Sequence, residues 1–129
     1  MGSLKKLRVN IHSFGFKYGV DDTAQLSFDV RGLPNPFYIE ELKHKTGLEK
    51  EVRDYVLSTK EAKEFLDNLI SFLECALSVY ESAGREEVTI SFGCTGGHHR
   101  SVTFAVVIFE HLKSKYPSTV THRDISKEN

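Results

Sequence analysis

Cysteine and net charge are both scarce in this sequence. The 129 residues include two cysteines, Cys75 and Cys94, and no Cys-x-x-Cys motif. This usage excludes a disulfide framework and favours a reducing compartment. The formal net charge is −1, which argues against a protein that binds nucleic acid through bulk positive charge. A local basic patch stays open as an alternative.

The sequence also lacks a segment that would place it in a membrane. No apolar run reaches the length that a membrane span needs. The first residues, Met1 to Lys6, do not form the apolar core of a signal peptide. We therefore expect a cytoplasmic protein that makes no membrane contact.

The length of the chain fits a single domain, which we assign to residues 1–129. A domain of this size buries enough surface to fold without a metal or a disulfide. Three histidines and a cysteine offer ligand types that zinc accepts, namely His98, His99, His122 and Cys94, but their spacing matches no standard zinc site. We predict neither a metal nor an organic cofactor.

Apolar residues that alternate with polar ones predict four strands, over residues 7–11, 26–30, 88–92 and 119–121. Capping-box pairs open two predicted helices, Thr46 with Glu49 and Ser58 with Glu61. These helices end near Leu57 and Ser82, and a nearly continuous apolar run predicts a third, buried helix over residues 102–109. The order of the elements predicts a small three-layer α/β domain with a mostly parallel sheet of about four strands flanked by helices.

The segment Gly93–Ser101 joins the third strand to the third helix and has the composition of an anion-binding loop. Glycines let backbone N–H groups turn inward around an anion, and the start of the helix adds further N–H groups. Arginine pairs bidentately with phosphate oxygens, and hydroxyl and imidazole groups add donors. The predicted phosphate-binding residues are Thr95, Gly96, Gly97, His98, His99, Arg100 and Ser101. The alternative is a glycine-rich turn that only packs the helix against the sheet.

Cys94 and Arg100 also have the spacing of the cysteine-phosphatase signature, in which a thiolate attacks phosphorus while arginine holds the oxygens. Gly93 stands where those enzymes usually carry histidine. A general acid would have to come from elsewhere, and the candidates are Asp21, Asp22, Asp29 and Asp124. The alternative role of Cys94 is that of a small buried residue at a strand end. Catalysis by Cys94 and Arg100 therefore stays an alternative to binding.

Three further basic residues are predicted to reach the rim of the same site. Lys17 lies in a glycine-containing loop after the first strand, and His122 and Arg123 follow the last strand. Loops after parallel strands gather at one edge of the sheet, where such folds bind ligands. A solvated lysine and an exposed tail are the respective alternatives.

The chain resembles the C-terminal domain of RapZ-like proteins, bacterial regulators that bind small RNAs and sense an amino-sugar phosphate. The resemblance covers almost the whole chain. It rests on Ser13-Phe14-Gly15-Phe16-Lys17, Asp29-Val30-Arg31, Leu33-Pro34-Asn35-Pro36, Thr46-Gly47-Leu48, Gly93-Cys94-Thr95-Gly96-Gly97, His99-Arg100-Ser101 and His122-Arg123.

This resemblance implies a phosphate or sulfate site at the Cys94 loop, a role in sensing a phosphorylated small molecule, and RNA contact through basic residues. It does not imply nucleotide hydrolysis, which the family assigns to an N-terminal P-loop domain. The motif of that domain, G-x-x-x-x-G-K-[ST], does not occur here, so we expect a stand-alone C-terminal-like domain. A homodimer is the candidate assembly.

Overall fold

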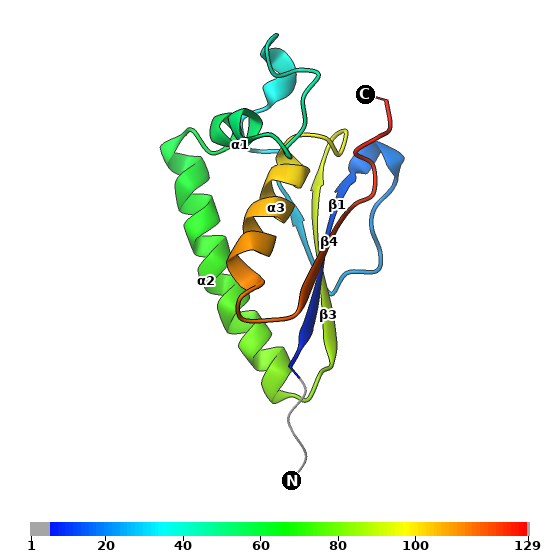
Figure 1. Cartoon of the computed structure of the whole chain (residues 1–129), viewed down its shortest axis with the longest axis vertical. Coiled ribbons are helices and arrows are strands. Elements are labelled where there is room, and N and C mark those ends of the chain that lie inside the picture. Colours follow the sequence, from blue (N-terminus) through cyan, green and yellow to red (C-terminus); the bar gives the residue numbers. More distant parts are fainter. Residues whose placement is uncertain (1–5, 129) are drawn as a thin grey trace.

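The computed structural model describes residues 6–128, and its centre is a four-stranded parallel sheet (Figure 1). The strands are β1 (Arg8–Gly15), β2 (Leu26–Asp29), β3 (Glu87–Cys94) and β4 (Ser118–His122). Their order in the sheet is β2-β3-β1-β4, and every neighbouring pair is parallel. The predicted α/β class with a parallel sheet of about four strands flanked by helices is therefore confirmed.

The helices are α1 (Lys50–Val56), α2 (Lys60–Ser82) and α3 (Arg100–Leu112), together with two short 3-10 turns, η1 (Phe16–Tyr18) and η2 (Pro36–Tyr38). None of the helices within residues 6–128 is both long and apolar enough to cross a membrane. The last predicted strand and all three predicted helices are present, with shifted ends.

The first two helices begin later than predicted, at Lys50 and Lys60. One half of the predicted capping box at α1 is present, because the backbone N–H of Thr46 donates to the Glu49 carboxylate at 3.2 Å. The Thr46 hydroxyl accepts a hydrogen bond from the backbone N–H of Leu48, so Thr46 closes a turn and α1 begins only at Lys50. For α2 the capping residue is Thr59, whose Oγ1 accepts from the N–H of Ala62 at 3.0 Å. The Ser58 hydroxyl instead donates to the carbonyl oxygen of Tyr55.

Both long helices cover the same face of the sheet. In Figure 1, α2 and α3 lie on one side of the strands, and the blue connection after β1 lies on the other. This placement follows from the right-handed crossover rule, under which the direction of a connection across the sheet decides the face that it covers. The connections β2 to β3 and β3 to β4 advance in one direction and so place α2 and α3 on one face. The connection from β1 to β2 runs in the opposite direction and so covers the other face. The layer opposite the helices is therefore the segment between β1 and β2.

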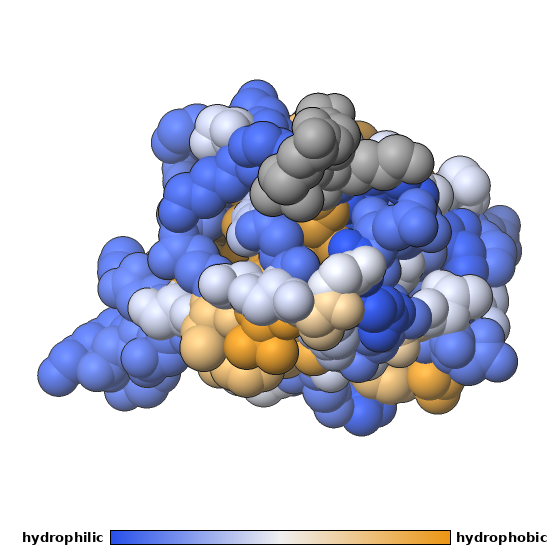
Figure 2. Space-filling model, turned by 90° about the horizontal axis from the view of Figure 1, so that it is seen from below, coloured by the Kyte–Doolittle hydropathy of each residue, from blue (hydrophilic) through white to orange (hydrophobic). Residues whose placement is uncertain are grey.

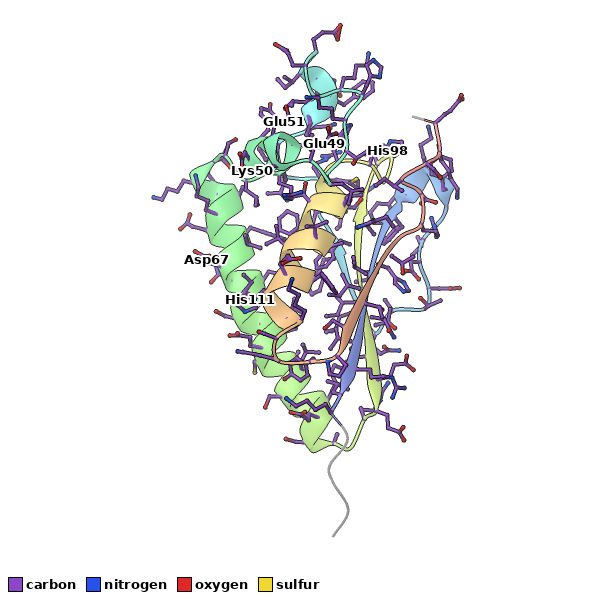
Figure 3. All side chains as sticks on the ribbon, viewed as in Figure 1. Glu49, Lys50, Glu51, Asp67, His98 and His111 are labelled. Atoms are coloured by element: carbon purple, nitrogen blue, oxygen red, sulfur yellow. The ribbon has the colours of Figure 1, made fainter. Side chains whose placement is uncertain are left out.

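Aromatic rings join the helical layer to the sheet. Phe92 on β3 lies 5.6 Å from the ring of Phe28 on β2 and 6.0 Å from that of Phe104 on α3. Phe104 and Phe28 in turn meet Phe65 and Phe72 of α2. On the outer side of α2 and α3, His111 and Lys115 both pair with Glu74 at 2.9 Å; Figure 3 shows His111 on α3, facing α2. The helices are thus held to the sheet by apolar contact and to each other by a surface ion-pair cluster.

The other face of the sheet carries polar side chains that bond to the connecting segment. His12 Nδ1 lies 2.8 Å from Asp21 Oδ2, and the N–H of Thr89 donates to Gln25 Oε1 at 2.7 Å. Because all four strands run in parallel, the carboxyl ends of β1 and β3 meet in register at Gly15 and Cys94. The fold therefore brings the two glycine-containing loops to one edge.

Candidate anion-binding site

The turn between β3 and α3 is short and tightly packed against the loop after β1. β3 runs to Cys94 and α3 begins at Arg100, so only residues 95–99 lie outside regular structure. Gly97 has φ +82°, and a Cβ there would lie 2.7 Å from the backbone nitrogen of Gly15. A Cβ on Gly15 would lie 2.5 Å from the carbonyl carbon of Gly96. Only glycine fits at these contacts, so the close approach of the two loops depends on both glycines.

A cavity of about 260 Å³ opens beside this turn. Three segments form its walls: the Gly93–Ser101 loop with the start of α3, the segment that contains η2, and η1, which contributes Lys17. Figure 3 shows His98 on the turn at this end of the sheet. The lining residues are Lys17, Asn35, Phe37, Tyr38, Cys94, Thr95, Gly96, His98, His99 and Arg100. One side of the cavity is therefore rich in donors and the other is aromatic.

Arg100 is the central group of the donor side. The residue is only 6% exposed, and Nη1 donates to the backbone carbonyl oxygens of Arg31 and Leu33. Its Nε is buried and has no hydrogen-bond partner among the described residues. No carboxylate of residues 6–128 forms an ion pair with it. A buried guanidinium with an unused N–H is strongly suited to an anionic partner, since an uncompensated buried charge is costly.

His99 supports the site in its neutral form. Burial lowers the pKa of the His99 imidazole below the ordinary value of 6.5, and the nearby His98 and Arg100 act in the same direction. Nε2 lies 3.1 Å from the carbonyl oxygen of Lys43, so it carries the proton and donates. Arg100 bonds to the carbonyl oxygens of Arg31 and Leu33, before η2, and His99 bonds to that of Lys43, after it. Arg100 and His99 therefore attach both ends of the η2 segment, residues 31–43, to the turn.

Cys94 and Ser101 form a pair at the base of the turn. The Cys94 thiol donates to the Ser101 hydroxyl, with Sγ 3.1 Å from Oγ. Cys94 is 2% exposed and lines the cavity, whereas Ser101 is fully buried behind it. Ser101 therefore touches the cavity only through Cys94.

A sequence profile of the RapZ C-terminal domain matches residues 7–126. The chain belongs to this family. It is 49% identical over 127 residues to a nucleotide-binding protein of Caldicellulosiruptor saccharolyticus. The aligned region covers 98% of this chain and 43% of that protein. It is also 49% identical to a nucleotide-binding protein of Bacillus pumilus and 50% identical to one of Lactobacillus johnsonii, in each case over 41% of the relative. The chain thus spans less than half the length of the curated relatives that it matches.

The structure brings some of the predicted site residues of this RapZ-type domain together and leaves others apart. Thr95, Gly96, His98, His99, Arg100 and Lys17 line the cavity. Gly97 and Ser101 contribute to the shape of the turn but do not line the cavity. His122 and Arg123 do not line it either: His122 Nδ1 lies 2.7 Å from Ser13 Oγ, and Arg123 pairs with Asp124.

The Arg123–Asp124 pair holds the loop after β1. Asp124 is fully buried, and its carboxylate accepts from the N–H of Gly15 at 2.8 Å. Burial alone would raise the pKa of Asp124, but hydrogen bonds from Arg123, Gly15 and Lys127 outweigh it and lower the pKa to about 2. Arg123 also donates to the carbonyl oxygen of Gly19 at 2.6 Å. Both residues therefore position the Gly15 loop against the turn.

None of the acidic residues considered as general acids lines the cavity. Asp21 is paired with His12 on the far face of the sheet, Asp29 with Arg31, and Asp124 with Arg123. Asp22 is exposed. No carboxylate of the described residues is among those that line the cavity. Within residues 6–128, no group of three or more His, Cys, Asp or Glu side chains could hold a metal ion.

The aromatic wall is the part of the site that sequence reasoning missed. Phe37 and Tyr38 line the cavity from η2, and so does Asn35, whose Oδ1 caps that turn by accepting from the N–H of Phe37. The string Leu33-Pro34-Asn35-Pro36 contributed to the family resemblance, yet nothing in it indicates a contact with a turn some sixty residues later. Only the fold of the intervening helices brings the two segments together.

Proposed function

We propose that this chain is a regulatory RapZ-type domain whose cavity binds the phosphate group of a phosphorylated small molecule. The observation that carries the proposal is Arg100, a buried guanidinium that lines the cavity and whose Nε has no hydrogen-bond partner in the described part of the chain. An arginine whose Nη1 is already fixed by backbone carbonyls is oriented before a ligand arrives. Such preorganisation lowers the entropy cost of binding.

The surrounding groups support an anion rather than a cation. The donors around the cavity include the Lys17 ammonium, the Thr95 hydroxyl and the backbone N–H groups of the turn before α3. The positive end of the α3 dipole adds to their effect. Phosphate oxygens accept several hydrogen bonds at once, which suits this convergence of donors.

The aromatic side of the cavity supports a ligand with an organic part. Tyr38 is 80% exposed beside the cavity, and its ring lies 5.6 Å from that of Phe37. Exposed aromatic rings at the mouth of a polar pocket give apolar contact area to a ligand such as a sugar ring. A sugar phosphate, with glucosamine 6-phosphate as the first candidate, therefore fits the proposal.

Isothermal titration calorimetry tests this function directly. We expect glucosamine 6-phosphate to bind more tightly than inorganic phosphate, because it meets both sides of the cavity. Unphosphorylated glucosamine is the matched control and should bind weakly or not at all. Equal binding of glucosamine and its phosphate would refute a phosphate site, and no binding by any of the three would refute the function.

A cysteine-dependent phosphatase is the second candidate, favoured by the Cys94–Ser101 hydrogen bond. Once the thiol has lost its proton, the Ser101 hydroxyl can rotate and donate to the thiolate, which stabilises a nucleophile at the cavity. The thiolate would displace the alkoxide from phosphorus and form a cysteinyl phosphate, with Arg100 holding the phosphoryl oxygens; the alkoxide would take a proton from water, since the lining has no carboxyl group. A second water would then cleave the S–P bond, which releases phosphate and restores the cysteine. Release of phosphate from an aryl phosphate, lost in Cys94→Ser, would establish this activity.

RNA binding stays a prediction. The basic residues predicted at this edge of the sheet are the candidates for RNA contact, namely Lys17, His98, His99, Arg100, His122 and Arg123. The first four line the cavity, so an RNA phosphate and a small phosphorylated ligand would compete there. His122 and Arg123 are held in contacts with Ser13 and Asp124. A structured small RNA should therefore be displaced by glucosamine 6-phosphate in a fluorescence-anisotropy titration, and RNA binding insensitive to the sugar phosphate would place it on another surface.

A further inference from the structure

Tyr38 is an exposed aromatic residue at a cavity whose other side is polar. It lines the cavity together with Arg100, yet 80% of the residue is exposed. In Figure 1 the η2 segment that carries Tyr38 projects from the end of the domain at which α3 begins. Most of this residue is therefore available to be covered by a molecule that enters the cavity.

The anchors of the η2 segment lie on both sides of Tyr38. Pro36 is buried before it, and Ile39 packs against the hydrophobic core after it. Phe37 and Tyr38 lie between these anchors, and we call the two residues the η2 tip. Within the tip, Phe37 is the more restrained, because Lys43 Nζ lies 4.9 Å from the centre of its ring. The tip can therefore move while its anchors stay in place.

The hydrogen bonds that shape the η2 tip are local. The N–H of Phe37 donates to Asn35 Oδ1 at 3.1 Å, and that of Tyr38 donates to the carbonyl oxygen of Asn35 at 3.3 Å. The N–H of Ile39 donates to the carbonyl oxygen of Pro36 at 2.9 Å. Each bond joins residues at most three apart, so opening of η2 alone breaks them and the sheet stays intact.

A ligand in the cavity would bridge this tip and a part of the fold that does not move with it. Thr95 and Arg100 line the cavity from the turn after β3 and the first residue of α3. Arg100 also donates to the carbonyl oxygens of Arg31 and Leu33, in the flank before the tip. A molecule that contacts both sides binds best when they are close together, so it shifts the tip toward the closed position.

We infer that the η2 tip is a lid, in which Tyr38 closes over the organic part of a phosphorylated ligand. The inference rests on the proposed function, because bridging requires the phosphate group on the Arg100 side. Inorganic phosphate reaches the donor side alone and leaves the tip open, so Tyr38 is the residue that distinguishes a sugar phosphate from phosphate. The surface around the tip then changes with occupancy of the site, which a regulatory domain requires.

Amide hydrogen exchange followed by NMR tests the closure at the N–H groups of Phe37, Tyr38 and Ile39. With each ligand at about 100 times its dissociation constant, glucosamine 6-phosphate should slow this exchange about tenfold or more, and inorganic phosphate less than about threefold. Ala83 and Gly84 are control amides with equally local hydrogen bonds, and their exchange rates should not change. They follow α2 at the opposite end of the domain, which Figure 2 views and shows to be mostly hydrophilic.

Calorimetry on the same samples separates the lid from the proposed function. Binding of glucosamine 6-phosphate without slower exchange in the tip, or equal slowing by inorganic phosphate, would overturn the lid and leave the phosphate site in place. No binding in the calorimeter would refute the phosphate site and the lid together.

A tryptophan at the tip gives a second readout, because the chain contains no tryptophan of its own. In Tyr38→Trp, glucosamine 6-phosphate should lower the quenching of indole fluorescence by acrylamide, since closure covers the ring. Val20→Trp is the matched control, because Val20 is 63% exposed in the connection after β1 and does not line the cavity. Unchanged quenching in Tyr38→Trp when calorimetry shows binding, or an equal change in both variants, would overturn the lid.

Discussion

The buried guanidinium of Arg100 donates a hydrogen bond to the backbone carbonyl oxygen of Arg31, which lies 69 residues earlier in the chain. This bond fixes one end of the segment that contains η2, while Arg100 also lines the cavity and keeps an Nε with no hydrogen-bond partner among the described residues. The same side chain thus shapes the aromatic wall and supplies the proposed anion contact. Its substitution should affect both binding and local structure.

Arg100→Ala should weaken the binding of glucosamine 6-phosphate by about 2–4 kcal/mol, the range for truncating one partner of a desolvated charge pair. Arg100→Lys should restore only part of the affinity, because an ammonium cannot replace a guanidinium that pairs bidentately. Calorimetry measures both, with Arg85→Ala as the control at an exposed arginine far along the chain. Unchanged affinity in Arg100→Ala would exclude the assigned role.

Cys94→Ser should preserve affinity for the phosphorylated ligand within about threefold, because the serine hydroxyl can still donate to Ser101 Oγ. If the domain only binds its ligand, wild type and variant should both leave aryl phosphates intact. A discontinuous phosphate-release assay checks this. Turnover by the wild type that disappears in the variant would instead favour the phosphatase alternative.

Gly15→Ala should destabilise the fold by about 1–3 kcal/mol or more, the range for overpacking a tight contact. The added methyl group would lie 2.5 Å from the carbonyl carbon of Gly96, so the loop and the turn must separate. Gly32→Ala is the matched control, because a Cβ there meets no atom within 4 Å. Urea denaturation of both variants gives the comparison, and equal stabilities would contradict the close packing.

Acidification from about pH 7.5 to about pH 5.5 should lower the free energy of unfolding, because burial lowers the pKa of both His99 and His122. Below the ordinary histidine value of 6.5 the unfolded chain binds more protons than the folded one, so stability rises with pH across this window and is lost as pH falls. His99→Gln can keep the hydrogen bond to Lys43 without titrating. We expect a smaller pH dependence of its urea midpoint; an unchanged slope would count against His99.

Asp124→Asn should destabilise the domain by about 1–3 kcal/mol at neutral pH, since hydrogen bonds from charged groups and from the Gly15 N–H weaken. The pKa of Asp124 falls from 3.8 to about 2 on folding, so its contribution is full above about pH 4 and is lost as pH falls toward 2. The variant should therefore lose less stability than the wild type over that acidic range. Thermal denaturation at several pH values measures the difference, and parallel curves would contradict the linkage.

Local sequence signals predicted most of the fold. Alternation in β1 and β3 indicated strands because one face of each packs on the helices while the other carries polar groups, as at Val9 and Asn10. The predicted helix starts differ from the observed ones because a capping residue and a turn residue look alike in sequence. The hydroxyls of Thr46 and Thr59 both accept a backbone N–H bond, but only Thr59 lies directly before the first residue of a helix.

The sequence by itself determined the Gly93–Ser101 turn, since glycines, donors and a helix start are contiguous there and need only local geometry. Tertiary structure alone decided what surrounds it. The aromatic wall, Asn35, Phe37 and Tyr38, is held at the cavity by hydrogen bonds from Arg100 and His99 to distant backbone carbonyls. Arg123 does not line the cavity, because it forms an ion pair with Asp124. Such long-range pairings depend on strand order and helix crossover, and no periodicity or short motif encodes them.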